Sequence, residues 1–397
     1  MTATLLVTND FHSAVPEGRR LLEALRRRRA EGALVVDAGD FFGGNAFHEF
    51  SQGRVEQELL TEMYDALVPG NHDVADLMRL SAPDSFPPVV CANMRPPDHF
   101  AGRWESGLVL DTRTGRVGIV GYMGAQAFAA IPVQERCGFT FREPTGALLA
   151  RERDRLRAAG ADTVIGLSHS GFAHDITDQE QAWPLPLVVS GHCHSAWYHW
   201  SSGGRHVVKA PENGRGLAEL ELDLSTPGRT RVTVETCPSG PPTAPDGLEQ
   251  TVAAYTAWGA APLGRLTAAL PAREDVARAA AEQGRAAVAA DTFLLNLASL
   301  RAGLPMQVTR RALADCAPFD ADLVVLDDTH TLQAVCDRAR AFGEEPVTAQ
   351  APCRAPGQRG TLATTRYLAD RLNLPARPAS PPRTLRGVLA DLLQEMP

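Results

Sequence analysis

Aspartate, asparagine and histidine recur in five short motifs in the first half of the chain. The motifs are DFH at residues 10–12, GD at 39–40, GNHD at 70–73, SHSG at 168–171 and GHCH at 191–194. Carboxylate, imidazole and amide groups together suit a borderline divalent ion such as manganese, zinc or iron, since all-oxygen sites favour magnesium or calcium and thiolate sites favour structural zinc. The candidate metal ligands are Asp10, His12, Asp40, Asn71, His169, His192 and His194.

This set is too large for one ion, and two ions that share a bridging carboxylate use such a number naturally. Metal pairs about 3.5 to 4 Å apart activate a bridging water and neutralise a phosphoryl oxygen. Taken singly, each motif has an ordinary explanation, because DxH and GD sequences are common in turns and helix caps and a lone buried histidine is usually part of the core. The five motifs in this order, each after an apolar run, favour a dinuclear metal centre.

The motifs follow short apolar runs that alternate with amphipathic stretches. We predict strands at residues 4–7, 33–36, 66–68, 89–91, 117–120, 163–167 and 187–189, and helices at residues 16–30, 54–64 and 146–159. Alternating strands and helices of this kind are typical of βαβ units. The motifs then lie in loops at strand ends, where a rigid sheet holds functional groups in place.

The pattern changes after residue 195 to close-set strands at residues 207–209, 217–224 and 230–236. The proline-rich stretch CPSGPPTAPDG that follows cannot continue a helix or a central strand, so we predict a linker there. Beyond it we predict a helix at residues 277–290, a strand at 323–326 and a final helix at 385–393. The expected organisation is a metal-binding domain over residues 1–236, a linker over 237–247 and a mixed α/β domain over 248–397.

Length and charge limit the class of protein. At 397 residues the chain is long enough for roughly two to three domains of about 150 residues. Its 39 basic and 47 acidic residues give a net charge of -8, which disfavours binding to nucleic acid polymers or to an anionic membrane surface. No apolar run approaches the roughly 20 residues that span a bilayer. An anionic substrate must therefore be attracted locally, by a metal or an arginine pocket.

The cysteines and the first residues bear on location. Seven cysteines occur without a CxxC pair, and an odd, scattered set argues against a disulfide framework and against a cysteine zinc site. The first residues read as a strand, without the basic and apolar segments of a secretory signal. We therefore expect a cytoplasmic location. Lys209 is the only lysine, and we attribute the dominance of arginine to a compositional bias.

The order DxH, GDxxxG, GNHD, SHxG and GHxH resembles that of the calcineurin-like metallophosphoesterase superfamily, and in particular its 5'-nucleotidase branch. The stretches FPPVVCANM, GRVGIVGYMG and ENGRGLAELELDL also fall where that branch has comparable runs. The resemblance implies an α/β (α+β) fold, with a four-layer α/β/β/α sandwich followed by a smaller mixed α/β substrate-binding domain.

Residue by residue, the resemblance implies one ion bound by Asp10, His12, Asp40 and His194, and a second bound by Asp40, Asn71, His169 and His192. Asp40 is then the bridge. His72 is implied to be a catalytic histidine that binds no metal and stabilises the transition state or protonates the leaving oxygen. A carboxylate three residues later commonly orients it in this branch, but here that place is Ala75. Asp73 and Asp76 flank it, and we favour Asp73 as the orienting acceptor.

The resemblance continues into the second half, with departures. In this branch an Asn-x-Gly-Gly-x-Arg segment delivers an arginine to the phosphate, and here Asn296 and Arg301 stand at the ends of NLASLR without the glycines. Phe319 in APFDAD matches a residue that stacks on the base, whereas Ala321 stands where an asparagine is usual. We expect substrate contacts from Asn296, Arg301 and Phe319, and from Asn93 in FPPVVCANM. The substrate is therefore expected to be a nucleotide or another small phosphorylated metabolite.

The function that the sequence favours is a dimetal hydrolase of phosphomonoesters, most simply nucleoside 5'-monophosphates in nucleotide catabolism. A hydroxide bridging the two ions is expected to attack phosphorus in line. An alternative on the same metal centre is a cyclic-nucleotide phosphodiesterase or a sulfur-ester hydrolase. An alternative of another class is a binding scaffold without catalytic activity, which would have no physical reason to keep a full set of ligands.

Overall fold

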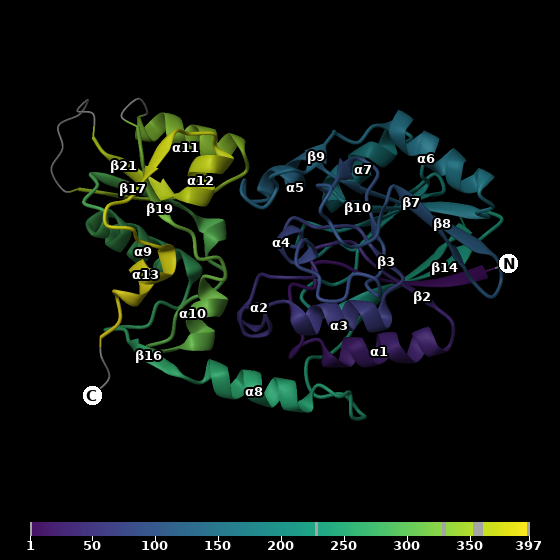
Figure 1. Ribbon diagram of the computed structural model, residues 1–397, viewed down its shortest axis with the longest axis horizontal. Coiled ribbons are helices and arrows are strands. Elements are labelled where there is room, and N and C mark those ends of the chain that lie inside the picture. Colours follow the sequence, from purple (N-terminus) through teal and green to yellow (C-terminus); the bar gives the residue numbers. More distant parts are fainter. Residues whose placement is uncertain (1, 227–228, 328–330, 352–359, 395–397) are drawn as a thin grey trace. The chain divides into compact units, whose positions relative to one another are not determined.

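The computed structural model describes residues 2–226, 229–327, 331–351 and 360–394 (Figure 1). The chain forms two compact units, the first from residues 1–43 and 51–250 and the second from residues 44–50 and 251–397. The sequence did not indicate that residues 44–50 belong to the second unit. No helix in the described part of the chain has the length and apolar character needed to cross a membrane.

The first unit contains two large sheets. The seven-stranded sheet has the order β15-β14-β1-β2-β3-β4-β6. Its strands are β1 (Thr2–Thr8), β2 (Leu34–Asp37), β3 (Ala66–Leu67), β4 (Val89–Val90), β6 (Trp104–Glu105), β14 (Gly216–Asp223) and β15 (Arg231–Thr236). The six-stranded sheet has the order β12-β13-β11-β10-β8-β7. Its strands are β7 (Gly107–Asp111), β8 (Arg116–Met123), β10 (Thr163–His169), β11 (Leu187–Ser190), β12 (His199–Ser202) and β13 (Arg205–Val208).

The two sheets pack face to face around one apolar core. Side chains alternate along each strand, so Leu5 and Val7 of β1 point to the same face and pack with Ile165 and Leu167 of β10. The remaining elements of this unit are α1 (Arg19–Ala30), α3 (Arg54–Met63), α4 (Val74–Leu77), α5 (Ala125–Ala130), α6 (Gly146–Ala158), α7 (Phe172–Glu180), β5 (Met94–Arg95) and β9 (Thr140–Phe141). In Figure 1, α1 and α3 lie side by side on one side of the sheets and α6 lies on the other. The α/β/β/α sandwich predicted from the sequence is confirmed.

The strand register brings the motifs to one edge of the sandwich. β1 and β2 are parallel, with Thr8 opposite Asp37, so the loops that begin after these residues leave the sheet together. β10 and β11 are also parallel, with Ser168 opposite Ser190. Each motif lies at the carboxyl end of its strand or in the loop that follows, and parallel strands place these ends at the same edge. This is why residues as far apart in sequence as His12 and His194, 182 positions, can build one site.

The second unit is a mixed α/β layer structure. Its five-stranded sheet, in the order β20-β17-β21-β19-β22, contains β17 (Thr292–Asn296), β19 (Leu323–Leu326), β20 (Pro346–Gln350), β21 (Leu362–Thr365) and β22 (Ala376–Pro378). The other elements are α2 (Ala46–Ser51), α8 (Glu249–Gly259), α9 (Arg273–Ala287), α10 (Arg310–Cys316), α11 (Leu332–Ala341), α12 (Arg366–Arg371), α13 (Leu385–Ala390), the short η2 (Leu297–Ser299), and the β16 (Pro262–Arg265) and β18 (Gln307–Thr309) pair. Phe293 and Leu295 pack on one face of this sheet and Leu294 on the other, so both faces are covered.

Residues 44–50 join the second unit through specific contacts. The backbone N–H of Ala46 donates to Asp315 Oδ1 (2.9 Å), and the ring of Phe47 meets that of Tyr255 edge to face at 5.2 Å between centroids. Glu49 pairs with Arg386. This segment begins four residues after Asp40, so the chain leaves the first unit directly beyond a predicted metal ligand.

Candidate metal centre

Four of the predicted ligands sit on backbone that side chains rarely adopt. The φ angles of Asp10, His12, Asp40 and His192 are 48°, 50°, 59° and 80°. Only ten residues other than glycine have positive φ in the described part of the chain, and these four are among them. Non-glycine residues with positive φ are uncommon, and such strain gathers at functional sites where the surrounding structure enforces it. The backbone conformation at these four residues therefore directs their side chains into the site.

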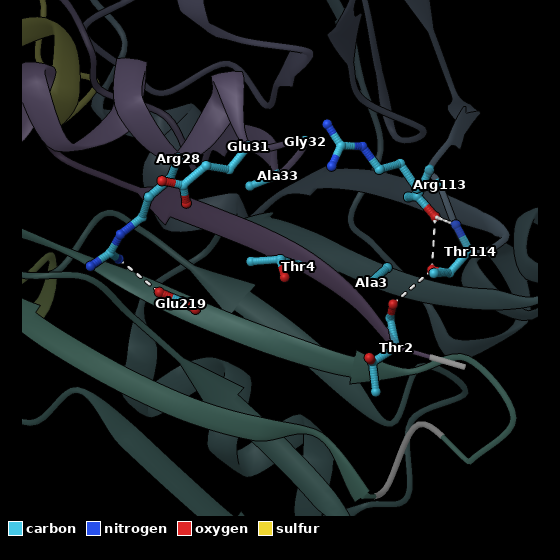
Figure 2. A pocket seen from close by; sticks show the side chains of 11 residues that line it. Thr2, Ala3, Thr4, Arg28, Glu31, Gly32, Ala33, Arg113, Thr114 and Glu219 are labelled. Atoms are coloured by element: carbon cyan, nitrogen blue, oxygen red, sulfur yellow. Dashed lines mark hydrogen bonds and ion pairs between the residues drawn. The ribbon is translucent and has the colours of Figure 1, made fainter.

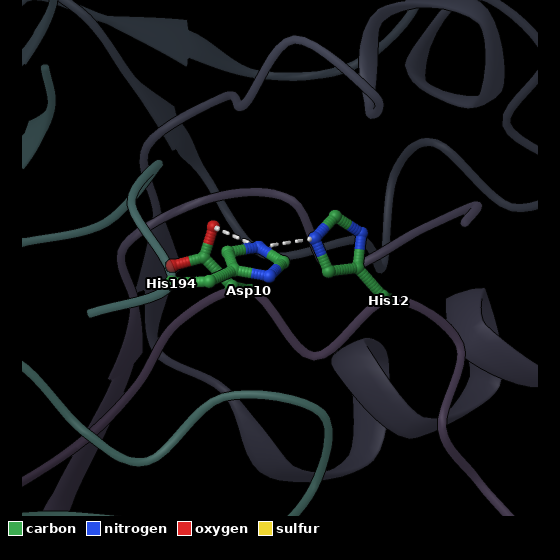
Figure 3. A group of neighbouring side chains, drawn as sticks. All are labelled: Asp10, His12 and His194. Carbon is green, nitrogen blue, oxygen red and sulfur yellow. Dashed lines mark hydrogen bonds and ion pairs between the residues drawn. The ribbon is translucent and has the colours of Figure 1, made fainter. Parts of the chain in front are cut away.

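The first cluster joins the β1 loop to the loop after β11. Asp10, His12 and His194 present ligand atoms that all lie within 4.8 Å of one another. His12 Nε2 is 3.1 Å from His194 Nε2, and His194 Nε2 is 3.8 Å from Asp10 Oδ1 (Figure 3). The three ligand atoms point toward one another as they do around a bound ion.

The second cluster contains Asp40, His169 and His192, again with ligand atoms within 4.8 Å of one another. His169 Nε2 lies 3.4 Å from Asp40 Oδ2. The side-chain oxygen of Asn71 lies 3.0 Å from His192 Nδ1 and 3.4 Å from His169 Nε2, so the amide completes this group. These are the residues predicted for the second ion.

A third group shows that Asp40 is shared. The ligand atoms of His12, Asp40 and His72 also lie within 4.8 Å of one another, and His72 Nε2 is 3.9 Å from Asp40 Oδ2. Asp40 is thus near ligands of both clusters, as a bridging carboxylate must be. The ring of His72 meets that of His12 edge to face, with centroids 5.2 Å apart.

Backbone groups orient the ligands. His169 Nδ1 lies 2.7 Å from the carbonyl oxygen of Ala38 and must donate to it, so Nε2 is the nitrogen that faces Asp40 and is placed to bind a metal ion. Asp10 accepts the backbone N–H of His192 at 3.0 Å and the side-chain N–H of Asn9 at 2.8 Å. These bonds tie ligands from different loops to one another.

The electrostatics of the cluster favour a bound cation. Burial raises the pKa of Asp10 to about 7, helped by the negative charge of Asp40. Burial also tends to raise the pKa of Asp40, but the positive charges of His169 and His72 outweigh it and hold that pKa well below its usual range. Burial lowers the pKa of His192 to about 3, so this ring is neutral and able to act as a ligand. Buried carboxylates beside neutral imidazole and amide groups are the donor set of divalent metals, and the residues present fit two such ions.

Asp73, predicted to orient His72, accepts backbone N–H groups of the ligand loops, and its effect on His72 stays a prediction. Its two carboxylate oxygens accept the backbone N–H groups of Asp40 (2.8 Å), Phe42 (3.0 Å) and Gly70 (2.7 Å). Burial and the charge of Asp40 raise the pKa of Asp73 to about 7. Asp73 therefore holds the two ligand loops together.

Two glycines allow the loops to approach closely. A Cβ atom on Gly70 would lie 2.1 Å from the backbone nitrogen of Asp40, and one on Gly191 would lie 2.2 Å from the carbonyl oxygen of Ala38. Both distances are far below contact, so any larger residue must displace a ligand loop.

A buried aspartate behind the second cluster was missed from the sequence. Asp175 of α7 accepts hydrogen bonds from Ser168 Oγ (2.9 Å), Ser190 Oγ and Tyr122 Oη (3.1 Å). Ser168 directly precedes His169, so this carboxylate braces the strands that carry the second cluster. Its only signal in the sequence is a position six residues after His169 on an expected loop, which does not separate it from a surface aspartate.

Two of the predicted substrate residues, Asn93 and Asn296, form hydrogen bonds within the fold. Asn93 is buried and its side-chain amide is used by the fold, since Nδ2 donates to the carbonyls of Met123 and Arg142 (both 2.8 Å) and Oδ1 accepts the Met123 N–H (2.9 Å). The expectation that Asn93 contacts substrate is therefore corrected. Asn296 is 1% exposed and donates to Glu344 Oε2 (3.0 Å), so it too is internal.

Arg301 and Phe319 are brought together on the second unit. The guanidinium carbon of Arg301 lies 5.8 Å from the ring centroid of Phe319, and Arg301 is exposed. An exposed arginine over an aromatic ring suits a ligand that is both anionic and planar.

The hollow drawn in Figure 2 lies away from these clusters. It has a volume of about 260 Å³ and is lined by the start of β1, the end of α1 and the turn before β8. Its residue Arg28 pairs with Glu219 and Glu235, which neutralise its charge. It contains none of the predicted ligands and supplies no chemistry to the metal centre.

Comparison with known proteins agrees with this geometry. Residues 3–196 match the family described as calcineurin-like phosphoesterase. That region holds all seven candidate ligands and both clusters. Residues 3–196 therefore form a calcineurin-like phosphoesterase domain.

Curated proteins that are similar to the chain include several 5'-nucleotidases. A snake venom 5'-nucleotidase of Crotalus adamanteus is 26% identical over 234 residues, which cover 52% of this chain and 39% of the relative. The 5'-nucleotidase of Homo sapiens is 28% identical over 234 residues, covering 51% and 40%. The match thus spans about two fifths of these relatives' length.

Solved structures share the fold over the whole chain. A 5'-nucleotidase precursor from Thermus thermophilus has a TM-score of 0.77 at 17% identity, covering 99% of this chain and 96% of its own. The sulfate thiohydrolase SoxB from the same organism has a TM-score of 0.76 at 17% identity, covering 100% and 96%. Both similarities concern the fold.

Proposed function

We propose that this protein is a dimetal phosphoesterase that hydrolyses phosphomonoesters. The observation that carries the proposal is that two ligand clusters share one carboxylate, Asp40, within a calcineurin-like phosphoesterase domain. The substrates that we propose are nucleoside 5'-monophosphates or related small phosphorylated metabolites, in line with the names of the relatives.

The proposed ligands divide between two sites. Asp10, His12, Asp40 and His194 would hold the first ion, and Asp40, Asn71, His169 and His192 the second. When bound, a pair of divalent ions supplies a water of lowered pKa and neutralises charge on a phosphoryl group. We propose manganese, zinc or iron, because the donor set mixes imidazole with carboxylate and amide oxygen.

His72 is proposed to act on the substrate rather than on a metal. Its side chain is 20% exposed, whereas that of Asp40 is 3% exposed, so the ring lies at the accessible side of the cluster. A histidine there can donate a proton to the leaving oxygen or a hydrogen bond to the phosphoryl group in the transition state.

Arg301 and Phe319 are proposed as substrate contacts of the second unit. A guanidinium group binds two phosphate oxygens at once, and an aromatic ring stacks on a planar group such as a base. The loss of Asn93 and Asn296 from the proposed contacts leaves recognition of the base itself unassigned. A cytoplasmic location remains our proposal on the basis of the scattered, odd number of cysteines.

The test is phosphate release from a panel of substrates by the metal-loaded full chain. The panel contains nucleoside 5'-monophosphates, sugar phosphates, a cyclic nucleotide and a sulfur ester, each with manganese, zinc or iron. We expect phosphomonoesters to be preferred. Preference for the cyclic nucleotide or the sulfur ester would replace the proposed substrate class while keeping the metal centre.

The variant Asp40→Asn tests the shared carboxylate. We expect a loss of activity of roughly a thousandfold or more and fewer than two bound ions, because both clusters lose a charged ligand. The control is Asp84→Asn, an exposed aspartate of the same unit. If no ester is hydrolysed and Asp40→Asn leaves metal content unchanged, the chain is a binding scaffold or another kind of protein.

A further inference from the structure

Lys209 directly follows β13, and its side chain is fully buried, at 0% exposed. It is the only lysine in a chain that otherwise uses arginine. Taking an ammonium group out of water has a large free-energy cost unless the group is paired and hydrogen-bonded. In a chain that uses arginine almost everywhere else, a buried lysine therefore indicates that its neighbours stabilise the ammonium group.

The ammonium group has three close neighbours. Lys209 Nζ donates to the carbonyl oxygen of Cys193 at 2.7 Å and to Glu212 Oε2 at 3.0 Å. It also lies 5.4 Å from the ring centroid of Tyr198. Glu212 balances the charge and the ring stabilises it further, so the ammonium is held where it can bind the Cys193 carbonyl.

The Cys193 carbonyl is part of the peptide group that joins Cys193 to His194. It lies in a loop without regular secondary structure after β11, and the side chain of His194 is 34% exposed. A loop of this kind has no ladder of backbone bonds to fix its peptide planes. The hydrogen bond from Lys209 therefore fixes the orientation of the peptide group between Cys193 and His194. That orientation directs the side chain of His194 toward Asp10 and His12 (Figure 3).

The residues after Lys209 contact Asn9 and Asp10, which lie on the β1 loop of the first cluster. The backbone N–H of Ala210 donates to Asn9 Oδ1 at 2.6 Å, and Asn9 Nδ2 donates to Asp10 Oδ2 at 2.8 Å. The backbone N–H of Asn213 donates to the carbonyl oxygen of Asp10 at 2.8 Å. One short segment, residues 209–213, thus contacts both sequence-distant parts of the first cluster.

We propose that Lys209 is a positioning residue of the first metal site, holding His194 and Asp10 in register for the first ion. The inference rests on the proposed dimetal function and deepens it. Lysine suits this place better than arginine, because an ammonium is a compact charge on a flexible stem, whereas a guanidinium presents a planar fork that needs a wider space. The second cluster has further supports of its own, since Asp73 accepts the backbone N–H of Asp40 and the carbonyl oxygen of Ala38 accepts from His169.

Manganese titration of the metal-stripped full chain tests the proposal. Calorimetry gives the affinity of each binding step, and electron paramagnetic resonance distinguishes a coupled pair of manganese ions from a single ion. The variants His194→Ala and His169→Ala identify which step belongs to the first site and which to the second. The test variant is Lys209→Met, which keeps an unbranched side chain and removes the charge and the donors.

We expect Lys209→Met to weaken the step that His194→Ala weakens by about 10- to 100-fold, the range known for residues that orient metal ligands. The other step should change less than twofold, and the signal of the coupled pair should appear only at higher manganese concentration. The proposal is overturned if the affinities of both manganese-binding steps are unchanged from wild type. It is also overturned if both affinities fall equally. A wild-type chain that binds fewer than two ions contradicts the proposed function as well.

A structural control separates positioning from general destabilisation. Arg28→Met removes a partly buried arginine that pairs with Glu219 and Glu235 in the same unit, away from the clusters. It should leave both manganese steps unchanged. If Lys209→Met does not fold, the double variant Lys209→Met and Glu212→Gln is tested in its place. The second change removes the carboxylate that would otherwise remain buried without a positive partner. Failure of the double variant to fold would make Lys209 a residue of the fold and overturn the proposal.

Discussion

At the metal centre, burial and charge act on the same carboxylates in opposite directions. Burial raises the pKa of Asp10 to about 7, although the charge of His169 lowers it in part, whereas the charges of His169 and His72 hold the pKa of Asp40 well below its usual range. Burial lowers the pKa of His169, but the charges of Asp40 and Asp10 outweigh it and raise that pKa to about 10. Metal ions replace these protons, so binding should release protons and tighten as pH rises.

The role of His72 can be separated from that of a ligand. His72→Asn should lower kcat by about 100- to 10,000-fold, the usual contribution of a general acid, while the protein still binds two ions. Metal content and kcat are measured on the same preparation, with Asp40→Asn as the variant that loses metal. If His72→Asn also binds fewer ions, then the group of His12, Asp40 and His72 is itself a metal site.

Asp175 gives a prediction for stability against pH. Burial raises its pKa to about 6 from an ordinary value of 3.8, although three hydroxyl donors lower it again in part. Because the folded pKa is the higher one, this group's contribution is complete below about pH 4 and is lost as the pH rises through about 6. The contribution of Asp175 alone to the free energy of unfolding should fall by about 3 kcal/mol over that range.

The variant Asp175→Asn removes this titration. Hydrogen exchange in β10 and β11 of the metal-free chain, measured from pH 4 to 7, gives the local free energy of opening for both proteins. The difference between wild type and variant should decrease with rising pH up to about 6 and then stay level. A difference that does not change with pH would show that Asp175 keeps an ordinary pKa in the fold.

At the scale of elements, the site depends on loops that leave parallel strands together. The predicted strands and helices before each motif are present, and β19 (Leu323–Leu326) has the predicted bounds. The pattern of apolar runs predicts such elements because burial requires it. The loops between them are instead held by Asp73 and by glycines, through contacts between separate motifs.

Gly70→Ala tests this close packing of loops. The new Cβ would lie 2.1 Å from the backbone nitrogen of Asp40, so the Asp40 loop must move. We expect manganese affinity to fall at least tenfold and stability to fall by about 1 to 3 kcal/mol. The control is Gly146→Ala, whose Cβ would meet its nearest atom at 3.8 Å and should change neither. Unchanged manganese binding in Gly70→Ala would mean that the loops tolerate displacement.

At the scale of the molecule, the two units differ in what a metal can stabilise. All candidate ligands lie in the first unit, whereas residues 44–50 and the sheet of β17 and β19 belong to the second. A ligand stabilises only the part of a protein that binds it. The net charge of -8 does not oppose an anionic substrate, because two divalent ions would set the local field at the metal centre.

Metal removal should therefore affect one unit. At manganese concentrations about 100-fold above the dissociation constant, each ion adds about 2.7 kcal/mol to the stability of the first unit. Hydrogen exchange should slow in β1, β2, β10 and β11 when manganese is added and return when it is chelated. Exchange in β17 and β19 should not change, and equal slowing in both units would contradict this separation.

The sequence by itself determined the kinds of ligand, their order and the sandwich that presents them, because residue type and apolar periodicity are local properties that one chain displays directly. Only the tertiary structure decided the positive φ of Asp10 and Asp40, the use of Asp73 by backbone N–H groups, the internal role of Asn93 and the burial of Lys209. Each of these depends on contacts between residues far apart in sequence, which leave no local pattern. The lone lysine, which composition explained as bias, acquired a role only when its ammonium group was found beside the peptide that carries His194.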